Sequence, residues 1–216
     1  MSRRYRLNDG APQASEMQMP AEQLAAFLNE EHDNNQKVSG IEVDENHVYF
    51  YTGVSEKESL ELVRILRKLD LEMMHVAYRL GLKETPPIHL HVHSPGGDIF
   101  SGLNICDAID QCKTDVYTYV EGSAASAGTL ITTRGDKRFI SKNSFMLLHQ
   151  PQIMWAGKHD EFMDEIENQK HIFSIVKRLY LESSKITEEE LENLLQHELW
   201  LPAERCLELG FVDQIL

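Results

Sequence analysis

The stretch that decides the fold is YVEGSAASAGTLI, from Tyr119 to Ile131. It carries no bulky side chain between Gly122 and Thr129, and it places two serines, Ser123 and Ser126, among glycines and alanines. A β-rich apolar segment precedes these small residues and a second apolar run follows them. The pattern predicts a strand that enters a helix at 122–124, with Ser126 in the first turn of the helix.

Ser126 is a candidate nucleophile at that position. The first turn of a helix has free backbone N–H groups and the positive end of the helix dipole, which favour a developing negative charge. A serine hydroxyl reacts only when a base takes its proton and donors hold the oxyanion. The alternative is a small-residue helix packed tightly against a sheet. The stretch also differs from the Gly-x-Ser-x-Gly elbow, because residue 124 is alanine.

Two other segments carry chemistry of the same kind. In HSPGGD, Gly96 and Gly97 free the backbone to present an N–H to a ligand. His149 ends the apolar run FMLLH and stands at a strand exit, where loops carry function. An ordinary turn and a hydrogen-bonded structural histidine are the alternatives for these two segments.

Composition limits the class of protein. Of 216 residues, 42% are hydrophobic and 26% charged, as in a globular domain. The net charge of −14 argues against nucleic acid or an anionic membrane as the main partner. The three cysteines have no metal-binding spacing, which favours reduced thiols in the cytoplasm. No apolar run is long enough to predict a secretory signal or a membrane span.

Three histidines, His89, His91 and His93, fall on one face of a predicted strand. They suggest a metal, but same-face neighbours along a strand are about 6.6 Å apart, which is awkward for three ligands on one zinc ion. No cysteine or carboxylate cluster accompanies them. We therefore expect no metal site here.

The chain is expected to form two parts. Residues 1–38 are polar and predict a partly flexible arm with a short amphipathic helix over 20–31, and residues 39–216 predict one domain. In the domain, strands and helices alternate, which predicts a mainly parallel sheet with helices on its faces. Two of the expected helices are opened by capping boxes, one at Ser55 and Glu58 and the other at Thr187 and Glu190. The other expected helices cover residues 98–112, 123–133, 158–184 and 202–209, and the third of these is the longest.

Four segments together resemble the proteolytic subunit of the ATP-dependent Clp protease. They are HSPGGDIFSGLNICDAI, YVEGSAASAGTLI, RFISKNSFMLLHQP and LGFVDQIL, and their order and spacing match that family from about Ile41 to Leu216. The resemblance implies the ClpP/crotonase fold, an α/β architecture of repeated β-β-α units with a mainly parallel sheet, flanking helices and a protruding long helix. It also implies a serine endopeptidase that hydrolyses unfolded polypeptides inside two stacked heptameric rings.

The resemblance also implies roles for individual residues. Ser126 matches the nucleophile and His149 the base. Gly97 and Ala127 match the backbone oxyanion donors, and Glu198 matches the acid of the triad. Ser123 falls at a variable position of the family motif.

The chain departs from the family in three places. Glu198 stands in ELWLPA, where the family has aspartate. Glu198 is therefore either the acid of the triad or an ordinary surface carboxylate, and His197 and Asp213 are the other nearby candidate groups. Asp213 is expected to face solvent in a closing strand. His89 and His91 replace aromatic residues that line a docking pocket for an unfoldase. The polar arm resembles neither the family's axial loop nor its propeptide.

The resemblance further implies no cofactor or metal in this subunit, ATP being used by a partner AAA+ unfoldase. It implies a homo-oligomer, for which we expect the cytoplasm, or the host cytoplasm if the protein is viral. From the charge and the lack of a long apolar run we expect no nucleic-acid or membrane partner. A specialised viral or maturation protease, a crotonase-like acyl-CoA enzyme of the same fold and a catalytically silent ring subunit remain the alternatives.

Overall fold

The structure is a computed structural model that describes residues 40–152 and 156–216. The chain divides into two units, Met1–Val38 and Ser39–Leu216. The predicted N-terminal arm and its short helix lie outside the described residues. All the described helices and strands belong to the second unit.

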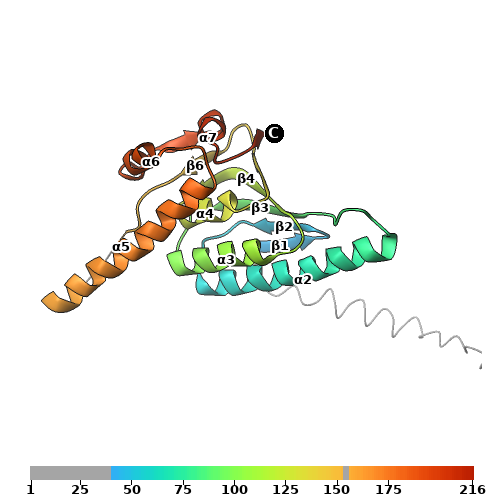
Figure 1. Cartoon of the computed structure of the whole chain (residues 1–216), viewed down its shortest axis with the longest axis horizontal. Coiled ribbons are helices and arrows are strands. Elements are labelled where there is room, and N and C mark those ends of the chain that lie inside the picture. Colours follow the sequence, from blue (N-terminus) through green and yellow to red (C-terminus); the bar gives the residue numbers. More distant parts are fainter. Residues whose placement is uncertain (1–39, 153–155) are drawn as a thin grey trace, which may run out of the picture. The chain divides into compact units, whose positions relative to one another are not determined.

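An eight-stranded, mainly parallel sheet forms the centre of this unit (Figure 1). The strands follow the order β1-β2-β3-β4-β5-β8, and β6 pairs with both β4 and β7. Two pairs, β1 with β2 and β6 with β7, are antiparallel. The bounds are β1 (Ile41–Asp44), β2 (His47–Phe50), β3 (Ile88–Ser94), β4 (Val116–Ala125), β5 (Lys137–Ile140), β6 (Phe145–Leu147), β7 (Trp200–Pro202) and β8 (Gln214–Ile215). The predicted mainly parallel sheet is confirmed. Strands were expected in the segments 47–53, 88–93, 115–122, 144–151 and 211–216, so β1, β5 and β7 are strands that the sequence pattern did not predict.

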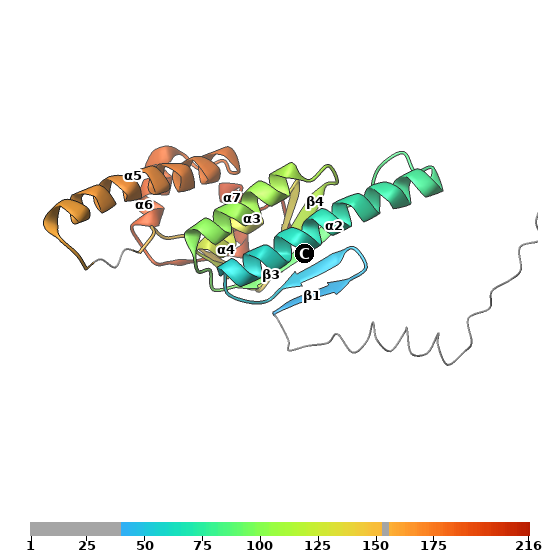
Figure 2. The same cartoon turned by 90° about the horizontal axis from the view of Figure 1, so that it is seen from below.

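Helices flank the sheet in the described residues. They are α2 (Glu56–Leu80), α3 (Ile99–Gln111), α4 (Ala127–Thr133), α5 (His159–Glu182), α6 (Glu188–Leu195) and α7 (Ala203–Leu209). Figures 1 and 2 show α2 and α3 side by side along the sheet and α5 reaching out beyond it. None of the described helices is long and apolar enough to cross a bilayer.

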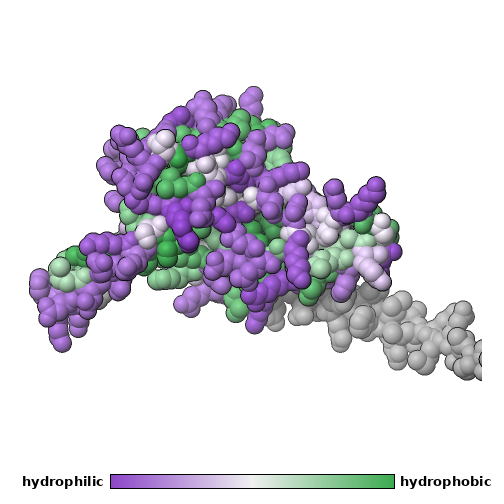
Figure 3. Space-filling view, in the orientation of Figure 1, coloured by the Kyte–Doolittle hydropathy of each residue, from purple (hydrophilic) through white to green (hydrophobic). Residues whose placement is uncertain are grey.

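The long helix α5 packs at only one end. Val176, Leu179 and Tyr180 near its C-terminus are buried, whereas Phe162 and Met163 near its start are exposed. The apolar side chains of the expected long helix are therefore only partly covered by the fold. Much of the projecting half is hydrophilic in Figure 3.

Two apolar clusters join the layers, and α4 takes part in both. One cluster joins β1, β2 and β3 to α2 and α3 and contains Leu90 and Ile131. The other joins β4, β5 and β6 to α5, α6 and α7 and contains Met146 and Leu130. Each fully buried side chain of this size contributes roughly 1.5–3 kcal/mol to stability. The short helix α4 is thus held from two sides, which fixes the turn that precedes it.

The small-residue stretch is half strand and half helix, which corrects the predicted start of the helix. β4 continues to Ala125 because it is paired on both sides, with β3 at Ala124 and with β6 from Ser123 onward. The hydrogen bonds of these two strand pairs satisfy the backbone N–H and C=O groups of residues that the prediction had placed in the helix. The chain turns at Ser126, which is the N-cap of α4 rather than a residue of its first turn.

The two predicted capping boxes form only in part. Ser55 precedes α2, but its hydroxyl donates to the Glu58 carboxylate instead of accepting a backbone N–H. Thr187 does accept from the Glu190 N–H at 3.2 Å, while the Glu190 carboxylate pairs with Arg205 of α7. Both helices still begin where the sequence predicts, because the helix pattern itself is unchanged.

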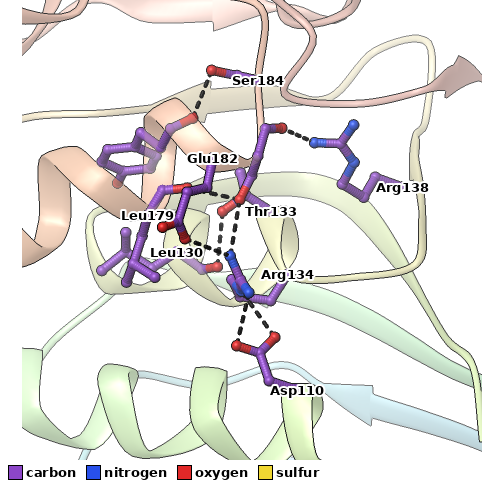
Figure 4. A network of polar contacts seen from close by, with 10 residues as sticks. Asp110, Leu130, Thr133, Arg134, Arg138, Leu179, Glu182 and Ser184 are labelled. Carbon is purple, nitrogen blue, oxygen red and sulfur yellow. Dashed lines mark hydrogen bonds and ion pairs between the residues drawn. The ribbon is translucent and has the colours of Figure 1, made fainter. Parts of the chain in front are cut away.

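Arginines fix the buried end of α5 (Figure 4). Arg134, which follows α4, donates to Asp110 of α3 at 3.0 and 2.7 Å and lies 3.8 Å from Glu182 of α5. Arg138 of β5 donates to the carbonyl after α5 and pairs with Asp213 at 2.6 Å. Asp213 is 45% exposed, which agrees with the predicted solvent-facing side chain, and the ion pair with Arg138 is a contact that the sequence pattern did not predict.

Candidate active site

Ser126 occupies a sharp turn between β4 and α4. Its φ of 51° and ψ of −125° lie in a region that residues other than glycine rarely adopt. Its N–H donates to the Leu147 carbonyl at 2.9 Å, and its own carbonyl accepts from the Thr129 N–H at 2.9 Å. Both neighbouring peptide groups are thus fixed, while the serine side chain remains half-buried.

The Gly96–Gly97 turn packs directly against Ser126. The two glycines have φ angles of 85° and 150°. A Cβ on Gly96 would lie 2.7 Å from the Ser126 Cβ, and a Cβ on Gly97 would lie 2.1 Å from the Val54 carbonyl oxygen. Only glycine fits at these two positions, so bare backbone approaches the serine.

The predicted oxyanion donors are the backbone N–H groups of Gly97 and Ala127, and the regular hydrogen bonds of the sheet and of α4 do not use them. Val54 bonds to the groups on either side of Gly97, through its N–H to the Gly96 carbonyl at 2.9 Å and through its carbonyl to the Asp98 N–H at 2.8 Å. In such a parallel bridge the N–H of the central residue points away from the partner strand. Ala127 is the first residue of α4, where an N–H has no intrahelical acceptor.

His149 and Glu198 come together from distant parts of the chain. His149 follows β6 and Glu198 precedes β7, and the pairing of Leu147 with Trp200 brings these antiparallel strands together. The His149 Nδ1 atom lies 3.4 Å from the Glu198 Oε1 atom. The imidazole side chain is 17% exposed, whereas the carboxylate is 68% exposed. The acid that the resemblance predicted therefore lies beside the predicted base.

Ser126 and His149 are joined through backbone rather than side chains. The Leu147 carbonyl that accepts the Ser126 N–H belongs to the strand that leads into His149. Between these two described side chains no hydrogen bond is formed. Catalytic hydrogen bonds in structures without substrate are often long and tighten only when substrate binds. The predicted nucleophile, base and acid therefore lie around one edge of the sheet in an open arrangement.

A cleft of about 680 Å³ opens beside the imidazole and the carboxylate. It is lined by His149, Gln150, Pro151, Gln152, Leu195, Gln196 and Glu198. A smaller hollow of about 220 Å³ under α5 shares two of these residues and adds apolar side chains from Ile166 and Phe173. The surface next to the imidazole and the carboxylate thus presents both polar and apolar side chains.

Ser123 takes a different position from Ser126. It lies within β4 opposite Phe145 of β6, and its N–H donates to the His93 Nδ1 atom at 3.2 Å. Together with Phe145 and Trp200 it lines an apolar hollow of about 380 Å³. This second serine therefore belongs to a strand surface and not to the turn.

The three histidines of β3 alternate with buried residues and point to the sheet face opposite α2 and α3. His89 stacks on His47 with ring centroids 4.3 Å apart. His91 stacks on Tyr119 at 4.6 Å, and Tyr119 stacks on Phe139 at 4.8 Å. We call this surface the ring face. Across the described residues no three His, Cys, Asp or Glu side chains are grouped so as to hold a metal.

The ring face is linked by hydrogen bonds that run across strands. The His47 Nδ1 atom lies 3.0 Å from the His91 Nε2 atom, and the His91 Nδ1 atom lies 2.8 Å from the Glu121 carboxylate. Burial lowers the pKa of His89, and the neighbouring His47 and His91 lower it further. The sequence pattern missed His47 and Glu121, because strand register alone brings them to the histidines of β3.

Comparison with known proteins gives a consistent result. The model of the Clp protease family matches residues 30–216. The ATP-dependent Clp protease proteolytic subunit of Streptococcus sanguinis strain SK36 is 34% identical over 137 residues, which cover 61% of this chain and 69% of that protein. The protein of the same name from Lactococcus lactis subsp. cremoris strain SK11 is 35% identical over 137 residues, covering 61% and 68%.

Proposed function

We propose that Ser126, His149 and Glu198 form the catalytic triad of this chain, which belongs to the Clp protease family and is therefore a serine endopeptidase. The observation that carries the proposal is the approach of His149 Nδ1 to Glu198 at 3.4 Å, just beyond β6, the strand whose last residue, Leu147, accepts the Ser126 N–H. Because Nδ1 faces Glu198, the other ring nitrogen, Nε2, is the one that accepts the proton of Ser126.

In this mechanism His149 Nε2 takes the proton of Ser126 as Oγ attacks the substrate carbonyl carbon. The carbonyl oxygen becomes an oxyanion and receives the N–H groups of Gly97 and Ala127. His149 then gives its proton to the departing amine, which leaves an acyl-enzyme. Water, deprotonated by the same nitrogen, releases the acid and restores the serine. Glu198 holds the tautomer with Nδ1 protonated and stabilises the imidazolium.

The substrates we propose are unfolded polypeptides, admitted as extended chains. The cleft of about 680 Å³ beside His149 supports this class, because it is open and lined by residues from separate segments. Membership of the Clp protease family does not favour a crotonase-like acyl-CoA enzyme. The relatives are named as proteolytic subunits of a protease, and neither name refers to an acyl-CoA substrate.

We also propose that the chain works in a homo-oligomer of two stacked heptameric rings, with a partner AAA+ unfoldase that uses ATP. The relatives are named ATP-dependent Clp protease proteolytic subunits. The exposed apolar side chains of Phe145, Leu199 and Trp200, and the projecting α5, support contacts with further copies. We propose a cytoplasmic location and no cofactor within this subunit.

A serine-directed fluorophosphonate tests the triad. We expect it to label the wild type and Ser123→Ala but not Ser126→Ala. In parallel, turnover of a fluorogenic peptide should fall on the order of 10⁶-fold in Ser126→Ala and remain close to wild type in Ser123→Ala. Near-wild-type turnover by Ser126→Ala would end the assignment of the nucleophile.

A further inference from the structure

A chain of two buried hydroxyl groups, neither of them part of the proposed triad, ends on the carbonyl group of Ser126. Besides the Thr129 N–H, the Thr129 hydroxyl donates to this carbonyl at 2.6 Å. The same hydroxyl lies 2.7 Å from the hydroxyl of Tyr180 on α5. Thr129 is 0% exposed and Tyr180 1% exposed, so water does not compete for these bonds.

The direction of this chain of hydrogen bonds follows from counting protons. A threonine hydroxyl has one proton, and Thr129 gives it to the Ser126 carbonyl. The Tyr180 hydroxyl must therefore donate to the Thr129 oxygen. Burial raises the pKa of Tyr180 above its ordinary value, so this donor keeps its proton at neutral pH.

Peptide geometry carries the effect to the proposed oxyanion hole. The Ser126 carbonyl and the Ala127 N–H belong to one planar trans peptide group and point in opposite directions. Holding the carbonyl therefore aims the N–H. Local backbone preference does not supply this orientation, because Ser126 has a φ of 51°, which costs energy for a residue with a side chain.

We propose that Thr129 and Tyr180 are positioning residues that aim the Ala127 N–H at the oxyanion of the substrate. The inference rests on the proposed function, in which Ser126 is the nucleophile. Because Tyr180 belongs to the buried end of α5, the projecting helix is connected to the oxyanion hole through two hydrogen bonds. Arg134 and Arg138 anchor that same end of α5 (Figure 4).

Three single variants and one double variant separate positioning from packing. Thr129→Val keeps the shape and removes both hydroxyl bonds, Thr129→Ser keeps the hydroxyl, and Tyr180→Phe keeps the ring. The double variant Thr129→Val/Tyr180→Phe leaves no unpaired buried hydroxyl, so its thermal stability should recover relative to Thr129→Val. Its catalytic defect should persist.

Losing an oxyanion donor outright lowers kcat by about 10²–10³-fold, so misaiming one should lower it by less. We expect kcat to fall roughly 10–100-fold in Thr129→Val and about 3–10-fold in Tyr180→Phe. KM should change little, and Thr129→Ser should stay within about twofold of wild type.

The affinities of two ligands distinguish a positioning role from a purely structural one, because a structural role would leave the ratio of the two affinities unchanged. A peptide boronate forms a tetrahedral adduct with the Ser126 Oγ atom and places an oxygen in the hole, whereas a non-cleavable peptide of the same sequence does not. Boronate affinity should fall in step with kcat across the four variants, and peptide affinity should not.

Wild-type kcat and boronate affinity in Thr129→Val, with only its melting temperature lowered, would overturn the positioning role. An equal loss of boronate and peptide affinity would overturn it as well, because it would indicate general loosening. Full turnover by Ser126→Ala would instead remove the nucleophile assignment, whatever the Thr129 and Tyr180 variants do.

Discussion

His149 and Glu198 meet at 3.4 Å across 49 residues of sequence, and the carboxylate that faces the imidazole is a glutamate with 68% of its side chain exposed. Glutamate is one methylene longer than the aspartate that the family resemblance leads one to expect. The structure accommodates it two residues before β7, where it approaches the ring from solvent.

Glu198→Gln should keep the fold and lower peptide turnover by up to ~10⁴-fold, because an amide favours the wrong tautomer of His149. Glu192→Gln on α6 is the matched control, since its carboxylate pairs with Lys177 at 2.7 Å and not with a histidine. Its turnover should stay at the wild-type level. Steady-state kinetics and light scattering on each variant check this. Equal and mild effects would mean that another group serves as the acid or that Ser126 and His149 act as a dyad.

Gly97→Ala should abolish most activity, because its Cβ would lie 2.1 Å from the Val54 carbonyl oxygen and must displace the turn. Displacing the Gly97 N–H should cost about 10²–10³-fold in kcat. Gly81→Ala tests strain without a clash, since its φ is 63° and nothing lies within 4 Å of the added Cβ. It should lower stability by about 1–2 kcal/mol and leave the kcat of the folded enzyme unchanged. Retained kcat in Gly97→Ala would remove this backbone from the oxyanion hole.

The ring face should bind an apolar loop of a standard AAA+ unfoldase weakly, because His89 and His91 put polar imidazole rings where the family has aromatic ones. His89→Tyr/His91→Tyr should strengthen unfoldase-dependent degradation, measured with a tagged unfolded substrate. His171→Tyr on the exposed side of α5 is the control and should change nothing. Tight coupling of the wild type, unaffected by changes at both histidines, would contradict the prediction.

Stability should fall on acidification because of His89. Its pKa is lowered in the folded protein, mainly by burial, so below about pH 6.5 the unfolded chain binds more protons than the folded one. The stability that this residue contributes is therefore present above pH 6.5 and is lost as pH falls toward the folded pKa. Melting temperatures between pH 7.5 and 5.5 should drop less in His89→Tyr than in the wild type. Parallel curves for the two proteins would exclude His89 as the cause.

Assembly is the remaining prediction. We expect light scattering or negative-stain microscopy to show a particle of about fourteen subunits, because ring closure and back-to-back pairing bury exposed apolar side chains such as Leu199 and Trp200. The acidic net charge of −14 favours dissociation at low salt, so several salt concentrations are needed. A monodisperse monomer at all of them would contradict a ring.

Local signals in the sequence were sufficient for much of the scaffold. The helices expected over 98–112 and 158–184 form as α3 and α5, and Asp98 caps α3 by accepting the Ser101 N–H. These features depend on residues a few positions apart, which is why spacing and residue type predict them. The family motifs likewise pointed to Ser126 and His149 without a structure.

Tertiary structure decided how those residues are placed. β4 runs on to Ala125 because β3 and β6 bond it on both sides, and this puts Ser126 in a positive-φ turn instead of inside a helix. The approach of Glu198 to His149 depends on the pairing of β6 with β7, and that of Tyr180 to Thr129 on the packing of α5 against α4. Strand register and helix packing act between distant segments, so no local pattern in the sequence encodes them.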